Sequence, residues 1–308
     1  MSATNRLPLR LLLATAAPVE SGDPSGAVGH LVNRLRKLAV ALGAVACLVT
    51  VSPAIDKTWD GSAGNNNFHT ASNWTPSGVP LSADNVFIDL SSADVLLSAY
   101  ASMTDLSVSN GAELSTNGNR MVVYDRATID GASLTVNSGA SGGDLDANFV
   151  DVKGTGIMWI LGGSAQIDES LTTFAGSNTV AGYGTIDLIG LDTTDGLVNN
   201  GYISVTNGPG LTIRATRGAT VDLDGATSAG IVNVINDSPL IVDAPLRDDF
   251  NGELRIYNDN EAYFAYPWTL NAARGTLVPA GKLEIGGGSQ GPAILSGAGL
   301  FTPRVGSN

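Results

Sequence analysis

Short runs of alternating apolar and polar residues recur along most of the chain. Three of them, residues 185–189, 202–205 and 211–214, lie close together and alternate with a period of two, as a β-strand with one buried face does. Asn200-Gly201 and Asn207-Gly208 separate them, and both pairs predict tight corners because Asn and Gly adopt positive φ at small steric cost. One such unit cannot bury its apolar face alone, whereas stacked copies can. The pattern therefore predicts a β-solenoid.

Comparable strand-like runs continue on both sides of this centre. They are residues 95–97, 105–108, 121–124, 128–130, 133–136, 149–152, 157–161, 165–168, 220–223, 231–235, 240–242, 253–257, 262–264 and 282–285. Short strands with regular turns also fit an antiparallel sandwich, but no helical period interrupts the pattern here. We therefore expect an all-β chain folded as a single-stranded, right-handed parallel β-helix, with residues 91–285 forming the solenoid.

Large aromatic residues concentrate just before these repeats. Trp59, Phe68 and Trp74 lie close together in a chain that is otherwise poor in aromatics. The core of a solenoid is open where stacking begins unless side chains cover it, and three large rings can do so. We expect residues 55–90 to form an aromatic-rich N-terminal cap.

The same segment resembles the opening segment of many bacterial surface proteins with autotransporter-type β-strand repeats. The shared pattern of W-D-G, N-W, G-x-P and D-x-x-x-I is matched by Trp59, Asp60, Gly61, Asn73, Trp74, Gly78, Pro80, Asp84 and Ile88. Residues 182–187 and 196–203 are similar to coils of filamentous-haemagglutinin and autotransporter passenger proteins, where L-x-N-x-G-x-I marks a strand, a corner and the next strand. Residues 222–234 and 250–256 resemble coils of the same class. Over residues 58–290 the resemblance implies a secreted bacterial β-solenoid, and it implies no activity.

The N-terminal region indicates export. Residues 33–54 have a basic start, an apolar stretch and a small-residue end, which is the order of a secretory signal peptide. We expect translation to start near Val32, a signal peptide at residues 32–54, and cleavage after Ala54. Residues 1–31 would then be a mis-assigned start or a disordered leader.

Alternatives for the two ends of the chain stay open. An uncleaved membrane anchor would use the same apolar run, which is shorter than the roughly 18 residues typical of a span. A lipoprotein would be acylated at Cys47, although Ala44 stands where a large aliphatic residue is usual. Residues 286–308 form a Gly-rich tail without a sorting motif, so we expect a truncated chain or one that is released or retained by other means.

Composition and charge favour a β-rich chain and argue against a nucleic-acid partner. The chain has 38 glycines among 308 residues and only 6% aromatic residues, which suits short strands and tight corners better than helices. The net charge is −13, and residues 55–308 carry 11 basic against 27 acidic residues. Phosphate backbones require clustered Lys and Arg, so we expect no nucleic-acid partner. The single cysteine, Cys47, lies in the predicted signal peptide, so the mature chain would have no disulfide and no thiol nucleophile.

Catalytic chemistry has few candidates. A Ser-His-Asp site would depend on His69, for which a loop or cap histidine is the simpler interpretation. Glycoside hydrolysis needs two carboxyl groups about 5–10 Å apart, which Asp222 with Asp224, or the adjacent pair Asp248-Asp249, would supply. The clustered Arg, Lys and His that bind acidic sugars in β-helix enzymes are missing, so we interpret these aspartates as solvated strand and corner residues.

One segment suggests a metal site. In residues 142–148, Asp144, Asp146 and Asn148 alternate, as the oxygen ligands do in the first half of a calcium loop. Phe149 stands where the turn-forming Gly is expected, and no bidentate Glu follows at the usual spacing. We therefore favour an acidic corner between two coils, with calcium as the alternative and no other cofactor expected.

A second aromatic group lies near the C-terminal end of the repeats and includes Tyr257, Tyr263, Tyr266 and Trp268. It is the leading candidate for a carbohydrate platform, although stacked aromatic rows or an end cap are the ordinary explanation in a solenoid. The sequence thus predicts a non-catalytic secreted or cell-surface β-solenoid with a structural or adhesive role, whose partners are extracellular polysaccharides or surface proteins. We expect a mature chain that does not span a membrane. The alternatives are a polysaccharide-binding module and a β-helix polysaccharide lyase or hydrolase.

Overall fold

The computed structural model describes residues 53–139, 143–225, 230–248, 250, 252–257 and 260–266, together with the backbone of five strands between residues 268 and 301. The chain divides into two units, residues 1–52 and 53–308, and all described residues belong to the second. The predicted leader, nearly all of the predicted signal peptide and most of the predicted tail lie outside the described residues.

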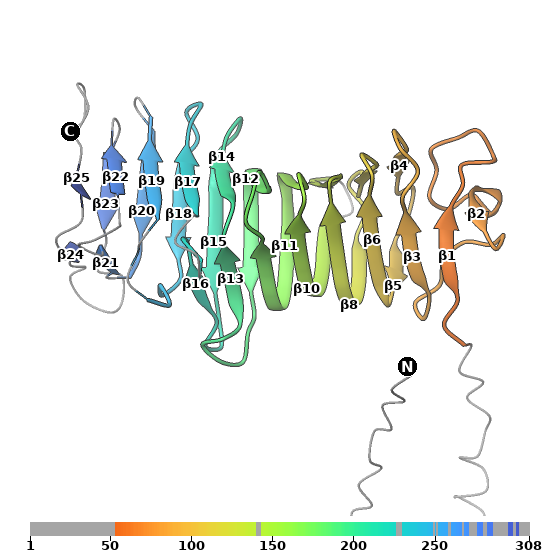
Figure 1. Ribbon diagram of the computed structural model, residues 1–308, viewed down its shortest axis with the longest axis horizontal. Helices are drawn as coiled ribbons and strands as arrows, with labels where there is room; N and C mark the ends of the chain where they lie inside the picture. Colours follow the sequence, from red (N-terminus) through yellow and green to blue (C-terminus); the bar gives the residue numbers. More distant parts are fainter. Residues whose placement is uncertain are drawn as a thin grey trace, which may run out of the picture. The chain divides into compact units, whose positions relative to one another are not determined.

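Apart from one 3₁₀ turn, η1 (Ala71–Asn73), the regular structure of the described residues is β-strand. One sheet of 23 strands winds into a parallel β-solenoid of about eight turns (Figure 1). Strands of successive turns pair in parallel, whereas β1 (Asp56–Trp59) pairs antiparallel with β2 (Trp74–Thr75). The predicted parallel β-solenoid is therefore confirmed, and the antiparallel sandwich is excluded.

Each turn presents three sheet faces, which we name A, B and C in chain order. Face A contains β1, β3 (Asn85–Ile88), β6 (Asp105–Ser109), β13 (Gly196–Asn199) and β16 (Thr220–Asp222). Face B contains β4 (Asp94–Leu96), β7 (Glu113–Ser115), β9 (Ser133–Asn137), β14 (Tyr202–Val205), β17 (Ile231–Val234), β19 (Glu253–Ile256), β22 (Thr276–Pro279) and β25 (Leu300–Phe301). Face C contains β5 (Ala101–Met103), β15 (Leu211–Ala215), β18 (Leu240–Asp243), β20 (Glu261–Phe264) and β23 (Lys282–Ile285).

Four longer strands pass from one face to the next without a break. They are β8 (Met121–Asp130) and β10 (Asp144–Lys153) from face C to face A, β12 (Thr179–Leu188) from B to C, and β11 (Ile157–Thr173) across all three faces. The remaining strands, β21 (Trp268–Leu270) and β24 (Leu295–Gly297), pair with each other in a separate two-stranded sheet.

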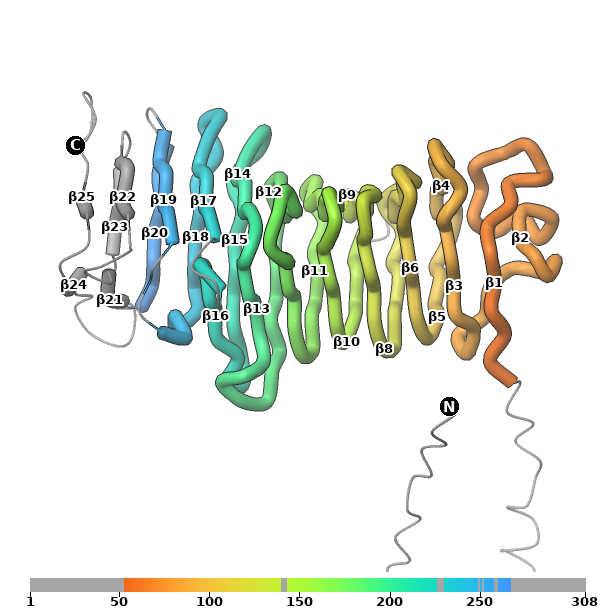
Figure 2. The backbone as a smooth tube through the Cα atoms, in the orientation of Figure 1, coloured from red at the N-terminus to blue at the C-terminus, as the bar shows by residue number. Residues whose placement is uncertain are grey.

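The rungs differ in length, and the extra residues lie in the corners. On face B, Leu114 pairs with Val95, 19 residues earlier, whereas Val232 pairs with Ile203, 29 residues earlier. The corner between faces C and A is continuous strand in β8, β10 and β11, but it opens into a loop at residues 189–195. In Figure 2 the green loop between β12 and β13 projects beyond the corners of β8, β10 and β11.

Inward-facing side chains form a continuous apolar core. In-register pairing on face A stacks Leu106, Ala127, Val150, Leu171 and Leu197 in one column, and each is at most 1% exposed. Residues two apart along a strand point to the same side, so the alternation in the sequence fills the core. Burying one large aliphatic side chain stabilises the fold by about 1.5–3 kcal/mol.

The predicted aromatic group is buried at the start of this core. Trp59, Phe68 and Trp74 are each at most 4% exposed, and the Trp74 ring meets the other two edge-on, with centroids 5.1 and 4.9 Å away. The indole Nε1 of Trp74 donates a hydrogen bond of 2.7 Å to the Phe68 carbonyl. Because β2 pairs with the edge of β1 opposite to β3, this segment covers the first rung as the sequence suggested.

The backbone conformation of the two Asn-Gly corners differs in part from the predicted positive φ. Of the four residues in the two pairs, Asn207 alone adopts positive φ, at 62°. At Gly201 a glycine is needed because the backbone of the preceding rung comes close. A Cβ there would lie 2.6 Å from the Asn178 carbonyl oxygen. The expectation of positive φ at Asn200-Gly201 is therefore wrong.

Candidate functional site

The outer side of face C carries a line of polar and aromatic side chains. In-register pairing of β5, β8, β10 and β11 stacks Ser102, Val122, Asp146 and Gln166 in one outward column. We call the surrounding residues the polar strip. It consists of Tyr100, Arg120, Tyr124, Asp144, Asp146, Gln166 and Asp168.

One ion pair and two hydrogen bonds connect the centre of the polar strip across three rungs. Arg120 Nη2 lies 2.7 Å from Asp146 Oδ2. The Gln166 amide nitrogen donates to Asp146 Oδ1 at 3.4 Å and to Asp168 Oδ1 at 3.2 Å. The hydrogen bond from Arg120 to Asp146 raises the pKa of the guanidinium. Burial raises the pKa of the neighbouring Asp144 carboxyl, because water solvates the charged form less well there.

Two tyrosines mark the N-terminal end of the polar strip. Tyr100 and Tyr124 are 52% and 51% exposed, although both side chains have polar partners. A hydrogen bond to Tyr100, together with the charge of that group, raises the pKa of Tyr124. His69 lies beside them, with Nε2 3.0 Å from the Tyr100 carbonyl oxygen and Nδ1 3.2 Å from Ser98 Oγ.

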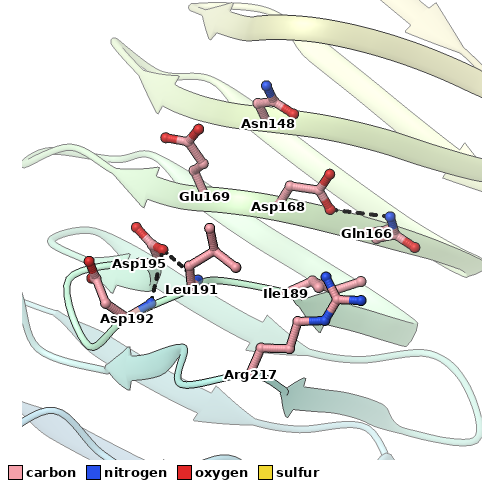
Figure 3. A pocket seen from close by; sticks show the side chains of 9 residues that line it. All are labelled: Asn148, Gln166, Asp168, Glu169, Ile189, Leu191, Asp192, Asp195 and Arg217. Carbon is pink, nitrogen blue, oxygen red and sulfur yellow. Dashed lines mark hydrogen bonds between the residues drawn. The ribbon is translucent and has the colours of Figure 1, made fainter. Parts of the chain in front are cut away.

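The polar strip continues into a groove of about 670 Å³ at the corner between faces C and A. The groove is lined by Asn148, Gln166, Asp168, Glu169, Ile189, Leu191, Asp192, Asp195 and Arg217, which come from four successive rungs (Figure 3). Asp195 Oδ2 accepts hydrogen bonds from the backbone N–H groups of Leu191 and Asp192, at 2.7 and 3.3 Å. That carboxylate therefore holds the loop 189–195 in shape.

The proposed calcium ligands lie in this region, but not on a loop. Asp144, Asp146 and Asn148 belong to strand β10, in which the side chains of Asp144 and Asp146 both point outward. The interpretations of this segment as a calcium loop or as an acidic corner are therefore wrong about its backbone. The alternation of outward Asp144 and Asp146 with inward Leu145 and Ala147 fits a strand, but the spacing of the aspartates suggested a calcium loop instead.

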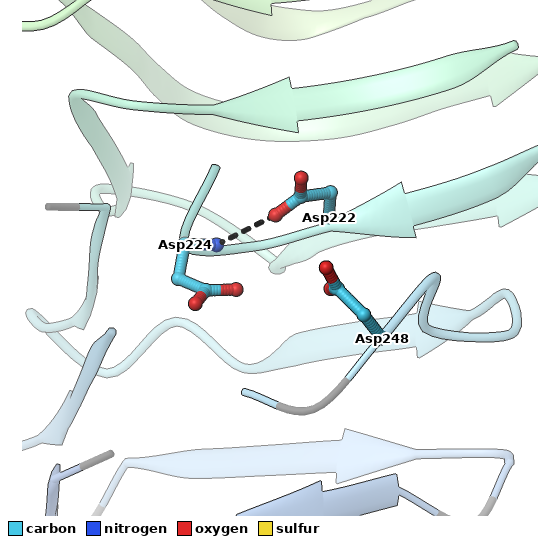
Figure 4. Close-up of side chains that lie close together, drawn as sticks. All are labelled: Asp222, Asp224 and Asp248. Carbon is cyan, nitrogen blue, oxygen red and sulfur yellow. Dashed lines mark hydrogen bonds between the residues drawn. The ribbon is translucent and has the colours of Figure 1, made fainter. Parts of the chain in front are cut away.

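The candidate catalytic aspartates converge elsewhere. Carboxylate oxygens of Asp222, Asp224 and Asp248 lie within 4.8 Å of one another (Figure 4), a geometry that a divalent cation can use. Asp222 and Asp224 are only 6% and 2% exposed, so the expectation that they are solvated is wrong. Asp222 Oδ1 accepts hydrogen bonds from the backbone N–H groups of Asp224 and Gly225, at 3.3 and 2.5 Å. The proposed partner Asp249 lies outside the described residues.

The C-terminal aromatic group does not form one platform. Tyr257 follows β19 on face B, Tyr263 lies in β20 on face C, and Tyr266 follows β20. Trp268 belongs to the separate sheet of β21 and β24, and its side chain lies outside the described residues. Proximity in the sequence suggested a common surface, but the winding of the solenoid distributes these residues over different sides.

Comparison with family models, with curated proteins and with solved structures gives no match. Within the residues described above, no helix has the length and apolar character needed to cross a membrane.

Proposed function

We propose that the chain is a secreted, non-catalytic β-solenoid that acts as a structural or adhesive element at the cell surface. The observation that carries this proposal is the polar strip and its groove, a line of outward-facing, interacting side chains on a continuous stacked core. A rigid ladder fixes the spacing of such groups, and groups that are already ordered lose little entropy when a partner binds. Export through a signal peptide at residues 32–54 is part of the proposal.

The contacts of the carboxylates favour binding over catalysis. Asp146 is engaged by Arg120, and Asp187 is held by Arg214 through contacts of 2.7 and 2.9 Å. Asp222 directs one carboxylate oxygen at backbone N–H groups inside the solenoid wall. Hydrolysis of a glycan requires instead a pair of carboxyl groups that face the substrate.

An adhesion assay combined with a turnover assay tests the proposal. Cells that display the full chain should adhere to surfaces coated with extracellular polysaccharide or protein, whereas cells without it should not, and the purified chain should release no reducing ends. Release of reducing ends that is lost in Asp222→Asn would establish the glycan-cleaving alternative. If the cells adhered to none of the coated surfaces, the adhesive role would be contradicted.

A further inference from the structure

Two tyrosines of the polar strip, Tyr100 and Tyr124, present their rings to solvent on adjacent rungs of the solenoid. Tyr100 and Tyr124 come from adjacent rungs and each is about half exposed, and interaction with the Tyr100 hydroxyl raises the pKa of Tyr124. Aromatic side chains offer large contact areas at low cost in conformational entropy. The axial C–H groups of a pyranose form a flat apolar surface that packs on such rings.

Hydrogen-bonding groups lie directly beyond the tyrosines. Arg120 has a side chain that is 53% exposed and contacts Asp146 through Nη2, and a guanidinium carries five N–H donors in all. Gln166 uses its amide nitrogen within the polar strip, and its carbonyl oxygen can accept a further bond. Aromatic rings beside donors and acceptors match the two chemical sides of a sugar, its C–H face and its hydroxyl rim.

The charge of the region selects among polysaccharides. Carboxylates outnumber the two arginines, Arg120 and Arg217, along the polar strip and groove. Polyanionic chains such as uronates are repelled by this balance, whereas hydroxyl-rich neutral chains are not. The spacing of the rungs also fits a polysaccharide, because rungs repeat about every 4.8 Å, close to the length of one pyranose unit.

We infer that the polar strip binds a neutral polysaccharide, which runs along the solenoid axis from Tyr100 toward the groove at Leu191. The inference rests on the proposed non-catalytic surface role and names the ligand class of that same surface. It moves the carbohydrate site from the C-terminal aromatic group to face C near the N-terminal end of the solenoid.

Affinity electrophoresis of the full chain in gels that contain a soluble glucan, mannan, xylan or galactan tests this inference, with polygalacturonate as the polyanionic comparison. At least one neutral polysaccharide should retard the wild-type chain. The double variant Tyr100→Ala/Tyr124→Ala should bind on the order of tenfold more weakly, as when an aromatic anchor is removed. Phe174→Ala is the matched control, since Phe174 is 42% exposed but lies outside the polar strip, and it should bind as the wild type does.

Several outcomes would overturn the inference. They are no retardation by any neutral polysaccharide, retardation by polygalacturonate alone, unchanged binding in the double variant, and loss of binding in Tyr263→Ala instead. Circular dichroism confirms that each variant is folded, and the milder Tyr100→Phe/Tyr124→Phe variant, which keeps both rings, should retain most of the binding. Adhesion to protein-coated surfaces without polysaccharide binding would refute this inference and leave the proposed surface role intact.

Discussion

Asn199 and Thr173 are hydrogen-bonded inside the solenoid, side chain to side chain, across adjacent rungs. Thr173 Oγ1 donates to Asn199 Oδ1 at 2.8 Å, while Asn199 Nδ2 donates to the Leu223 carbonyl oxygen of the following rung, also at 2.8 Å. Both side chains are at most 1% exposed. One buried amide thus ties together three successive rungs at the corner between faces A and B.

Asn199→Ala should destabilise the chain, because it leaves the Thr173 hydroxyl and the Leu223 carbonyl buried without their partner. We expect a loss of about 1–3 kcal/mol in the free energy of unfolding, measured by denaturant titration. Asn233→Ala is the matched control. Its Oδ1 is buried and accepts no hydrogen bond within the described residues, so its removal should be neutral or stabilising. Equal losses in both variants would contradict the role assigned to Asn199.

Leu197→Ala should lower the free energy of unfolding by about 2–5 kcal/mol, because it opens a cavity in the face A column. Leu197 is fully buried, whereas the adjacent Val198 points outward and is only partly buried. Val198→Ala should therefore cost about 1 kcal/mol or less. Similar losses for the two variants in denaturant titration would indicate that this column is not the core.

The contact between Tyr100 and Tyr124 can be measured without any ligand. Tyr124 should titrate above its ordinary pKa of 10.0, since the hydrogen bond to Tyr100 and the charge of that group favour its neutral form. In an absorbance titration, Tyr100→Ala should move this transition back toward 10.0. Tyr202→Phe, on face B, is the control and should leave the Tyr124 transition in place. A Tyr124 transition that does not respond to Tyr100→Ala would show that the hydroxyl groups do not interact.

Much of the fold could be predicted from local alternation, as the agreement at Tyr202–Val205 shows. Alternation alone did not predict the strand Gly196–Asn199, because its inward Asn199 is polar and is accommodated only through Thr173 and Leu223 of other rungs; the resemblance to coils with L-x-N-x-G-x-I did imply it. The polar strip depends on the same long-range register. Arg120 and Asp146 are 26 residues apart, and rungs of unequal length do not reveal from the sequence which residues stack.

The proposed signal peptide predicts where the mature chain begins. Secreted protein from a bacterial host should begin at Ile55, because cleavage after Ala54 follows the small-residue end of the predicted signal peptide. N-terminal sequencing of the secreted chain checks this position. Ala54→Trp should block cleavage, since a bulky residue replaces the small one, whereas Asp56→Asn should not. Retention of residues 1–31 in the secreted protein would refute the predicted start and signal peptide together.

The raised pKa of Asp144 predicts that the stability of the fold depends on pH, with a definite sign. Burial raises its pKa in the folded chain above the ordinary value of 3.8, so between these two values the folded state holds a proton that the unfolded state has lost. The stabilising effect is complete below pH 3.8 and disappears as the pH rises through the folded pKa. At neutral pH the charged Asp144 therefore costs stability, and Asp144→Asn should raise the free energy of unfolding there by less than about 1 kcal/mol, because water still screens a partly exposed group.

Below pH 3.8 the Asp144→Asn variant and the wild type should be nearly equal in stability, so the difference between them should grow with pH. Asp125→Asn, which changes an exposed aspartate at the corner within β8, controls for the change in net charge. Denaturant titrations at about pH 3 and about pH 7 measure both variants. If Asp144→Asn destabilised the chain at neutral pH, the carboxylate would be stabilised by Arg120 more than it is penalised by burial, and the predicted sign would be wrong.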